Sequence, residues 1–142
     1  MINRIKQRIQ EGFTLVEILI VVVIVGILAA IAIPTYFNYV EKAYASDAKT
    51  QIKNILMNAD IYRQEQGSYP DDITDMENGY LDIKESVKEK WTFEIDLSED
   101  GSTGTLSATS TEKMEGGADK TVTFDVETGK FSGYGQGDEE EE

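Results

Sequence analysis

The stretch that decides the fold is GFTLVEILIVVVIVGILAAIAIP, residues 12–34. Positions 13–33 hold 21 residues with one charge, Glu17, and one hydroxyl, Thr14. An α-helix rises about 1.5 Å per residue, so this run would be about 31 Å long, which matches the hydrocarbon thickness of a bilayer. We therefore expect a membrane-spanning helix here.

Basic residues precede this stretch, and most acidic residues follow it. Arg4, Lys6 and Arg8 outnumber the single acid before residue 12, Glu11. By the positive-inside rule, this short arm lies on the cytoplasmic side of the membrane. The whole chain has 13 Lys+Arg and 27 Asp+Glu, a formal net charge of −14. A single-pass precursor would therefore hold its acidic part outside the cytoplasm.

The composition excludes several classes of function. The chain has no His and no Cys, so it has no imidazole base, no thiol nucleophile, no disulfide and no zinc site of the usual kind. Its acidity would repel the phosphates of nucleic acids, and no basic patch offsets that repulsion. We predict a protein that is not an enzyme, needs no cofactor and binds no nucleic acid.

The helix should continue well beyond the membrane. From Pro34 the pattern becomes amphipathic, and it ends at Gly67 and Pro70. One face carries apolar residues at steps of three or four, namely Tyr36, Val40, Tyr44, Ala48, Ile52, Ile55, Ala59 and Tyr62. We expect one helix over residues 13–66. A kink or local melting is expected at Gly26 and at Pro34, which has no backbone N–H to donate.

Residues 67–134 read as a small sheet domain. Apolar and polar residues alternate in three segments, which predicts half-buried strands near 91–97, 105–109 and 121–126, with a short strand near 131–134. Such a sheet needs a cover, and the apolar face of the helix is available. The prediction is an α+β fold: a long N-terminal helix packed on three or four antiparallel strands. The inward side chains should be Trp91, Phe93, Val122 and Phe124. The acidic tail, residues 135–142, is expected to be disordered.

Two acidic clusters resemble sets of calcium ligands, because Ca²⁺ prefers clustered oxygen atoms. One comprises Asp71, Asp72 and Asp75, and the other lies in residues 96–100. Neither matches a complete calcium-loop motif, and loop tips are commonly acidic for solubility. We therefore predict no metal site.

The motif GFTLVE at residues 12–17, followed by an apolar helix and Pro34, resembles the start of a type IV pilin or a type II secretion pseudopilin. The likeness covers the chain to about residue 70 and includes GSYP at residues 67–70. The resemblance implies that a prepilin peptidase cuts after Gly12. It also implies that the new amine of Phe13 is N-methylated.

The resemblance further implies where the protein acts and what it contacts. The precursor would be a single-pass protein of the cytoplasmic (inner) membrane, and the processed subunit would join an extracellular pilus. Its partners would be other copies of the chain in a helical filament, the prepilin peptidase and methylase, the assembly platform and minor pilins. Many pilins have paired C-terminal cysteines that this chain lacks, so its C-terminal loop is loose or closed in another way.

Two interpretations of Glu17 compete. Thr14 and Glu17 have the spacing of a helix capping box, which explains the residue by geometry alone. A carboxylate in a lipid-embedded helix costs on the order of a few kcal/mol, however, so a counter-ion is expected. In a filament, Glu17 of one subunit can meet the Phe13 amine of a neighbour. We predict that this assembly salt bridge forms.

The preferred interpretation is a major pilin, and three alternatives stay open. Residues 1–32 also fit an ordinary secretory signal cut near Ala32, which would release a soluble binding domain. The N-terminal half equally fits a major pseudopilin, although no calcium-binding C-terminal loop of that class is evident. Four aromatic residues suggest electron transfer, but packing between subunits and beneath the sheet explains them more simply: Tyr36, Phe37, Tyr39 and Tyr44.

Overall fold

The computed structural model describes residues 12–136 and comprises two compact units, Met1–Phe37 and Asn38–Glu142. One helix, α2 (Leu15–Gln66), begins in the first unit and ends in the second. Almost all of the expected leader and most of the expected acidic tail lie outside the described residues, so both assignments stay predictions.

In the first unit, α2 is apolar and uncovered. None of residues 12–37 is buried, and the only charged side chain among them belongs to Glu17. The length and composition of the helix are sufficient to cross a membrane. A core helix of a soluble domain would have one covered face, and this stretch has none.

The helix continues without a break through Gly26 and Pro34. Two residues before the end of the first unit, the hydroxyl of Thr35 donates to the carbonyl oxygen of Ile31 at 3.1 Å. A Cβ at Gly26 would meet nothing within 4 Å, although glycine costs a helix about 1 kcal/mol relative to alanine. The single chain therefore gives no steric reason for this glycine, and the kink or melting stays a prediction for the assembled state.

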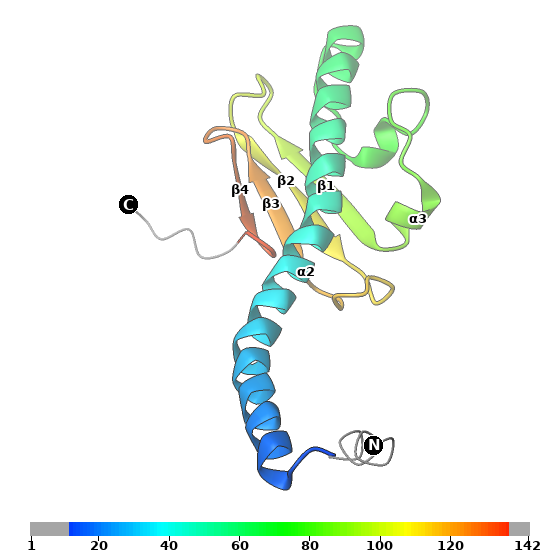
Figure 1. Cartoon of the computed structure of the whole chain (residues 1–142). Helices are drawn as coiled ribbons and strands as arrows, with labels where there is room; N and C mark the ends of the chain where they lie inside the picture. Colours follow the sequence, from blue (N-terminus) through cyan, green and yellow to red (C-terminus); the bar gives the residue numbers. More distant parts are fainter. Residues whose placement is uncertain (1–11, 137–142) are drawn as a thin grey trace, which may run out of the picture. The chain divides into compact units, whose positions relative to one another are not determined.

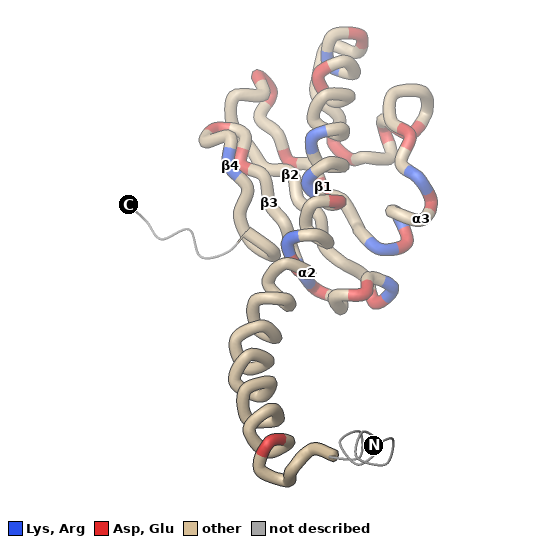
Figure 2. The backbone as a smooth tube through the Cα atoms, in the orientation of Figure 1, with Lys and Arg blue, Asp and Glu red and all other residues tan. Residues whose placement is uncertain are grey.

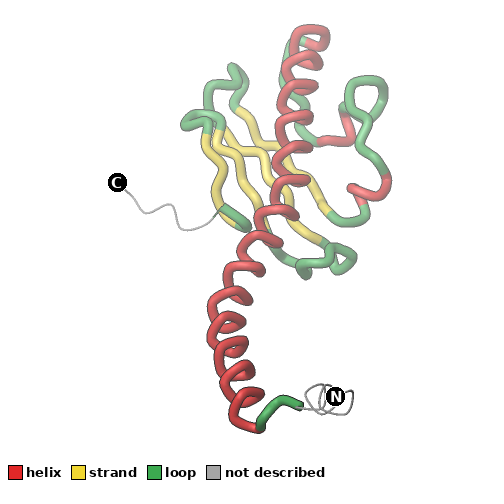
Figure 3. The backbone as a smooth tube through the Cα atoms, in the orientation of Figure 1, coloured by secondary structure: helices red, strands yellow, loops and turns green. Residues whose placement is uncertain are grey.

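The second unit is an antiparallel sheet with α2 lying across one face (Figures 1 and 3). The strands are β1 (Trp91–Leu97), β2 (Gly104–Ser110), β3 (Thr121–Asp125) and β4 (Lys130–Gly133), and they neighbour one another in that order. One row across the sheet aligns Ile95, Leu106, Phe124 and Phe131. The predicted α+β fold is confirmed, and the sheet is a simple meander.

The apolar face of α2 supplies the cover for the sheet. Its buried residues are Ala45, Ala48, Ile52, Ile55 and Ala59, and those of the strands include Trp91, Ile95, Leu106, Ala108 and Val122. The alanines leave room for the helix backbone to approach the strands. The predicted face is correct in its middle, but Tyr44 and Tyr62 are only half-buried and Tyr36 is 65% exposed.

The connection between α2 and β1 contributes more to the core than the sequence suggested. It contains a 3-10 helix, η1 (Ile73–Asp75), and a short helix, α3 (Glu85–Lys88). Four of its apolar side chains are buried: Ile73, Met76, Leu81 and Ile83. Their uneven spacing matches neither a strand nor a helix period, so the sequence pattern does not reveal their burial.

The loop that joins β2 to β3 is held without cysteines. Ser110 is buried, and its hydroxyl donates to the Gly117 carbonyl at 2.6 Å and accepts from the Lys120 N–H at 2.9 Å. Met114 is also buried in this loop. A buried hydroxyl with both partners present stabilises a closed loop, because breaking either bond would leave a polar group unpaired.

Two substitutions compare the centre of this core with its margin. Leu106 is 1% exposed, whereas Phe124 is only half-buried beside Phe131, with 4.8 Å between their ring centroids. In a soluble fragment from residue 38 onward, Leu106→Ala should lower the free energy of unfolding by about 2–5 kcal/mol. Phe124→Ala should cost less than the ~3–5 kcal/mol typical of a fully buried phenylalanine. Urea denaturation measures both, and no loss at Leu106 would refute the core assignment.

Candidate functional site

The N-terminus of α2 is closed by a capping box. The N–H of Glu17 donates to the Thr14 hydroxyl at 3.2 Å, and the N–H of Thr14 donates to Glu17 Oε2 at 2.8 Å. The N–H of Ile18 donates to the Thr14 carbonyl at 3.2 Å, which begins the helical ladder. The capping interpretation of Glu17 is therefore correct as geometry.

The capping box leaves the Glu17 carboxylate able to bind more. A carboxylate has two oxygens and about four lone-pair sites, and the bond from Thr14 uses one oxygen. All other charges of the described residues lie from Glu41 onward, so Glu17 is isolated in an uncharged stretch (Figure 2). Phe13 is 84% exposed, but its nitrogen is part of a peptide bond here. The pairing of Glu17 with a Phe13 amine stays a prediction, because that amine exists only after cleavage.

Gly12 precedes the helix in irregular backbone. A Cβ at Gly12 would meet nothing within 4 Å, and its φ is not in the left-handed region that favours glycine. Neither space nor backbone conformation in the described chain therefore requires glycine at this position. The role of Gly12 in leader cleavage stays a prediction.

The apolar side chains of the first unit are exposed on every side of the helix. Leu15 is 82% exposed, Ile31 is 66% exposed and even Ile18 is 49% exposed. Burial of one such side chain is worth about 1.5–3 kcal/mol, so a long uncovered run strongly favours a lipid or protein environment. Exposed large apolar side chains of the described residues are concentrated in this stretch.

The aromatic residues near the junction of the two units behave differently from one another. Tyr36, Phe37 and Tyr39 are 65%, 60% and 68% exposed, and only Tyr44 packs against the core. Packing beneath the sheet is therefore confirmed for Tyr44, and packing of the other three between subunits stays a prediction. Those three are exposed in the single chain and available to a neighbouring molecule.

The candidate calcium ligands are occupied by the chain itself. Asp72 Oδ1 accepts from the Thr74 N–H at 3.0 Å, and Asp75 Oδ2 accepts from the Asp72 N–H at 3.2 Å, so both cap η1. Asp100 Oδ1 accepts from the N–H and hydroxyl of Ser102 and from the hydroxyl of Ser98. Across residues 12–136, no group of three or more such carboxylates is arranged to hold a metal ion.

Asp100 gives the β1–β2 turn a dependence on pH. Hydrogen bonds from Ser102 and Ser98 hold the pKa of the Asp100 carboxyl at about 2, below its ordinary value of 3.8. A lowered folded-state pKa means that the stabilisation is complete above about pH 4 and is lost as the pH falls through about 2. Asp100→Asn should therefore lower Tm near neutral pH and reduce this acid-induced loss. Thermal melts of the fragment from residue 38, across that range of pH, measure both effects, and identical profiles would contradict the assignment.

Tyr69 of the GSYP segment connects the end of α2 to the same turn. Its hydroxyl donates to Asp60 Oδ1 at 2.7 Å, and the guanidinium carbon of Arg63 lies 5.0 Å from its ring centroid. Gly101 has a φ of +71°, and a Cβ there would lie 2.3 Å from the Tyr69 hydroxyl oxygen. The ring therefore requires glycine at the tip of the turn. No local sequence pattern indicates this contact.

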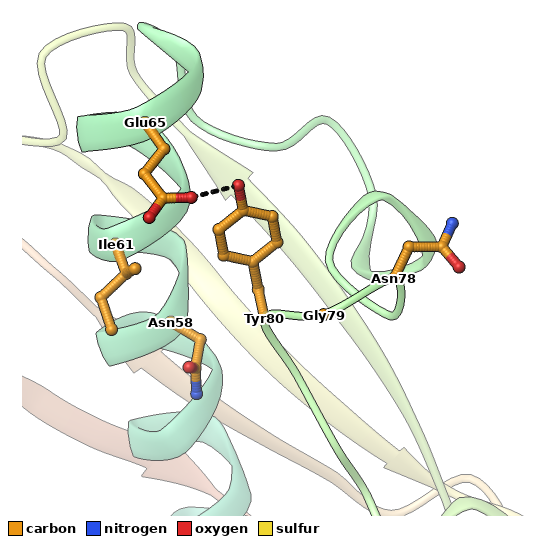
Figure 4. Close-up of a pocket in the computed structure, with 6 residues that line it drawn as sticks. All are labelled: Asn58, Ile61, Glu65, Asn78, Gly79 and Tyr80. Atoms are coloured by element: carbon orange, nitrogen blue, oxygen red, sulfur yellow. Dashed lines mark hydrogen bonds between the residues drawn. The ribbon is translucent and has the colours of Figure 1, made fainter.

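A shallow depression of about 390 Å³ lies between α2 and the following loop, lined by Asn58, Ile61, Glu65, Asn78, Gly79 and Tyr80 (Figure 4). The Tyr80 hydroxyl donates to Glu65 Oε2 at 2.5 Å and accepts from Gln66 Nε2 at 3.1 Å. The bond to Glu65 raises the pKa of Tyr80. The carboxylate and the phenol already bond to each other, so the depression offers no activated nucleophile.

Comparisons with known proteins single out the N-terminal segment. Residues 7–33 match the family model described as the prokaryotic N-terminal methylation motif. The chain is 34% identical to fimbrial protein EcpC of Eikenella corrodens over 103 residues, which is 72% of this chain and 64% of EcpC. It is 32% identical to the type IV major pilin protein PilE of Neisseria gonorrhoeae over 105 residues, 74% of this chain and 61% of PilE.

A third relative belongs to a secretion system. The chain is 43% identical to type II secretion system core protein G of Pseudomonas aeruginosa over 65 residues, 46% of each chain. The chain thus spans less than two thirds of the length of each of these three relatives. All three are named as fimbrial, pilin or secretion-system proteins.

Proposed function

Because the chain belongs to the family of type IV pilins and type II secretion pseudopilins, we propose that it is a major pilin, a structural subunit that polymerises into a filament. The observation that carries the proposal is the uncovered apolar helix that follows GFTLVE. Its side chains are exposed on every side in the single chain, so we expect lipid or other protein to cover the whole helix. Lipid would surround it first, and other copies afterwards.

Processing would prepare the subunit for assembly. A prepilin peptidase cuts after Gly12 and the Phe13 amine is methylated, which leaves a positive group one turn before Glu17. The lack of any internal reason for glycine at position 12 supports a recognition role for that residue. Before the cut, the basic arm and the apolar helix hold the precursor in the inner membrane.

Assembly would follow from the properties of the helix. Apolar helices from many copies pack at the centre of the filament and remove their side chains from water or lipid. In that environment Glu17 and a neighbour's Phe13 amine each lack water, so pairing favours one axial register over others. Tyr36, Phe37 and Tyr39 offer exposed aromatic surface for contacts between subunits.

The second unit would lie outside the filament core. It carries the charged residues from Glu41 onward. Carboxylates in its depression and in its acidic clusters, namely those of Glu65, Asp72 and Asp100, already accept hydrogen bonds from the chain itself. A charged, folded outer domain keeps a filament soluble. This arrangement supports a structural role for the chain.

A major pseudopilin is the second candidate. The match to core protein G favours it, because identity over those 65 residues is 43%. The matches to fimbrial and pilin proteins extend over 103 and 105 residues and so include part of the sheet unit. This wider agreement favours the pilus.

Imaging of the cell surface tests the proposal. Electron microscopy of the source cells should show long filaments that disappear when the gene is deleted and return when it is restored. Labelling with an antibody against the fragment from residue 38 should decorate those filaments along their length. Unchanged filaments in the deletion strain would refute the major pilin assignment, and a secretion defect without filament loss would support the pseudopilin.

A further inference from the structure

We propose that Asn78 is a site of spontaneous deamidation, in which its side-chain amide is converted to a carboxylate with the help of Gly79. The proposal concerns the loop between α2 and β1 and does not depend on the filament function. Asn78 and Gly79 form an Asn-Gly pair, and both residues are exposed.

The backbone around this pair is open to reaction. Gly79 has a φ of +117°, a conformation that needs glycine, and a Cβ there would meet nothing within 4 Å. The N–H groups of Tyr80 and Leu81 both donate to the Met76 carbonyl, at 3.0 and 2.9 Å. Within the part of the chain that the structure describes, no hydrogen bond restrains the Gly79 N–H or the Asn78 side chain. Figure 4 shows the Asn78 amide pointing away from Tyr80.

These features leave both reacting groups accessible and free to rotate toward each other. The Gly79 backbone nitrogen loses its proton and attacks the Asn78 side-chain carbonyl carbon, forming a new C–N bond. The carbon–nitrogen bond of the side-chain amide breaks, and ammonia leaves with the protons it needs from solvent. Water then opens the five-membered imide at one of its two carbonyl carbons. The products are aspartate and isoaspartate, and no oxidant or reductant is required.

Other asparagines of the chain provide internal controls. Asn54 and Asn58 lie within α2, where the amide of Asn58 donates to the Asn54 carbonyl at 2.8 Å. The residues that follow them, Ile55 and Ala59, are buried. An attack at either site would need the helix to open locally, so these asparagines should react at least about tenfold more slowly than Asn78.

The new carboxylate would change its surroundings. It would lie next to Glu77, whose Oε1 accepts from Lys88 Nζ at 2.5 Å. The isoaspartate product also inserts an extra carbon into the backbone between residue 78 and Gly79, one residue before Tyr80. We therefore expect the contact between Tyr80 and Glu65 to weaken and the loop to become more mobile as the protein ages.

Peptide mapping by mass spectrometry tests the proposal. The full chain, purified in detergent, is incubated at mildly alkaline pH beside a synthetic peptide that carries the same residues around Asn78. The peptide spanning Asn78 should gain about one dalton with time, at a rate similar to that of the synthetic peptide. Asn54 and Asn58 should stay unchanged over the same period. Conversion at Asn78 that is tenfold or more slower than in the free peptide would show that the fold protects it, and the proposal would be wrong.

A matched variant distinguishes deamidation at Asn78 from reactions elsewhere in the chain that also add negative charge. Asn78→Gln keeps a side-chain amide but requires a larger, slower-forming ring. Isoelectric focusing of the wild-type chain should show an acidic form that accumulates with time, and the variant should lack it. An acidic form that accumulates equally in both chains would place the reaction elsewhere and overturn the assignment.

Discussion

Glu17→Gln subunits are expected to enter the membrane and lose residues 1–12, yet to form few or no filaments. The change removes a charge and leaves a neighbour's Phe13 amine without a counter-ion in an apolar core. Breaking a buried ion pair in this way typically costs about 3–5 kcal/mol. The capping box should survive, because glutamine replaces glutamate in that motif and its oxygen can accept from the Thr14 N–H.

A second variant isolates the cap from the charge. Thr14→Val removes the hydroxyl that accepts from the Glu17 N–H but keeps the carboxylate. Loss of an N-terminal cap costs about 1 kcal/mol, so filaments should persist in this variant. Filament counts by electron microscopy, beside a blot for the processed subunit, compare the two. Normal filament numbers from Glu17→Gln would show that Glu17 is only a helix cap.

The second large effect is expected at Gly12. Gly12→Val should block removal of residues 1–12, so the precursor stays in the membrane and no filaments form. The described chain has room for a larger side chain at this position. Loss of cleavage would therefore come from the peptidase and not from misfolding of the subunit.

Gly26→Ala is the matched control for that experiment. This substitution also adds a Cβ at a glycine where that position is empty. Gly26 lies inside α2, away from the cleaved peptide bond. Its precursor should be cut normally. Mass measurement of membrane-bound protein distinguishes cut from uncut chains, and Gly12→Val protein of mature mass in surface filaments would refute the cleavage site.

The sequence predicted the elements whose patterns are regular. Alternation from Trp91 to Leu97 and apolar steps from Ala48 to Ala59 placed β1 and the buried face of α2 correctly. It placed Phe124 on the inward face, but alternation does not say how near the edge of the core a residue lies. Phe124 packs toward Phe131 of β4, the edge strand, and stays half-buried.

The parts that were missed depend on contacts between segments distant in the chain. Nothing near Tyr69 in the sequence indicates that its ring needs glycine at position 101. Ser110 likewise has the local appearance of an ordinary strand residue, yet its hydroxyl closes the loop to β3. Such roles follow from the tertiary arrangement, which a local pattern does not encode.

The helix cap is the one part of the candidate site that the described residues of a single uncut chain allow to be compared with the sequence. The cap between Thr14 and Glu17 follows from spacing alone, and the structure confirms it. The pairing of Glu17 with Phe13 requires a cut chain and a neighbouring subunit, so a single uncut chain does not contain it. Tyr36 was expected on the covering face but is 65% exposed, because helical periodicity places a residue on a face without showing where the covering sheet ends.

The central claim is that the mature protein begins at Phe13 and uses its apolar helix for assembly. N-terminal sequencing and mass spectrometry of protein sheared from the cell surface test it most directly. The account predicts a first residue of Phe13 with one added methyl group on its amine. A first residue of Ile33 would instead show an ordinary secretory signal and a soluble domain, and it would contradict the account.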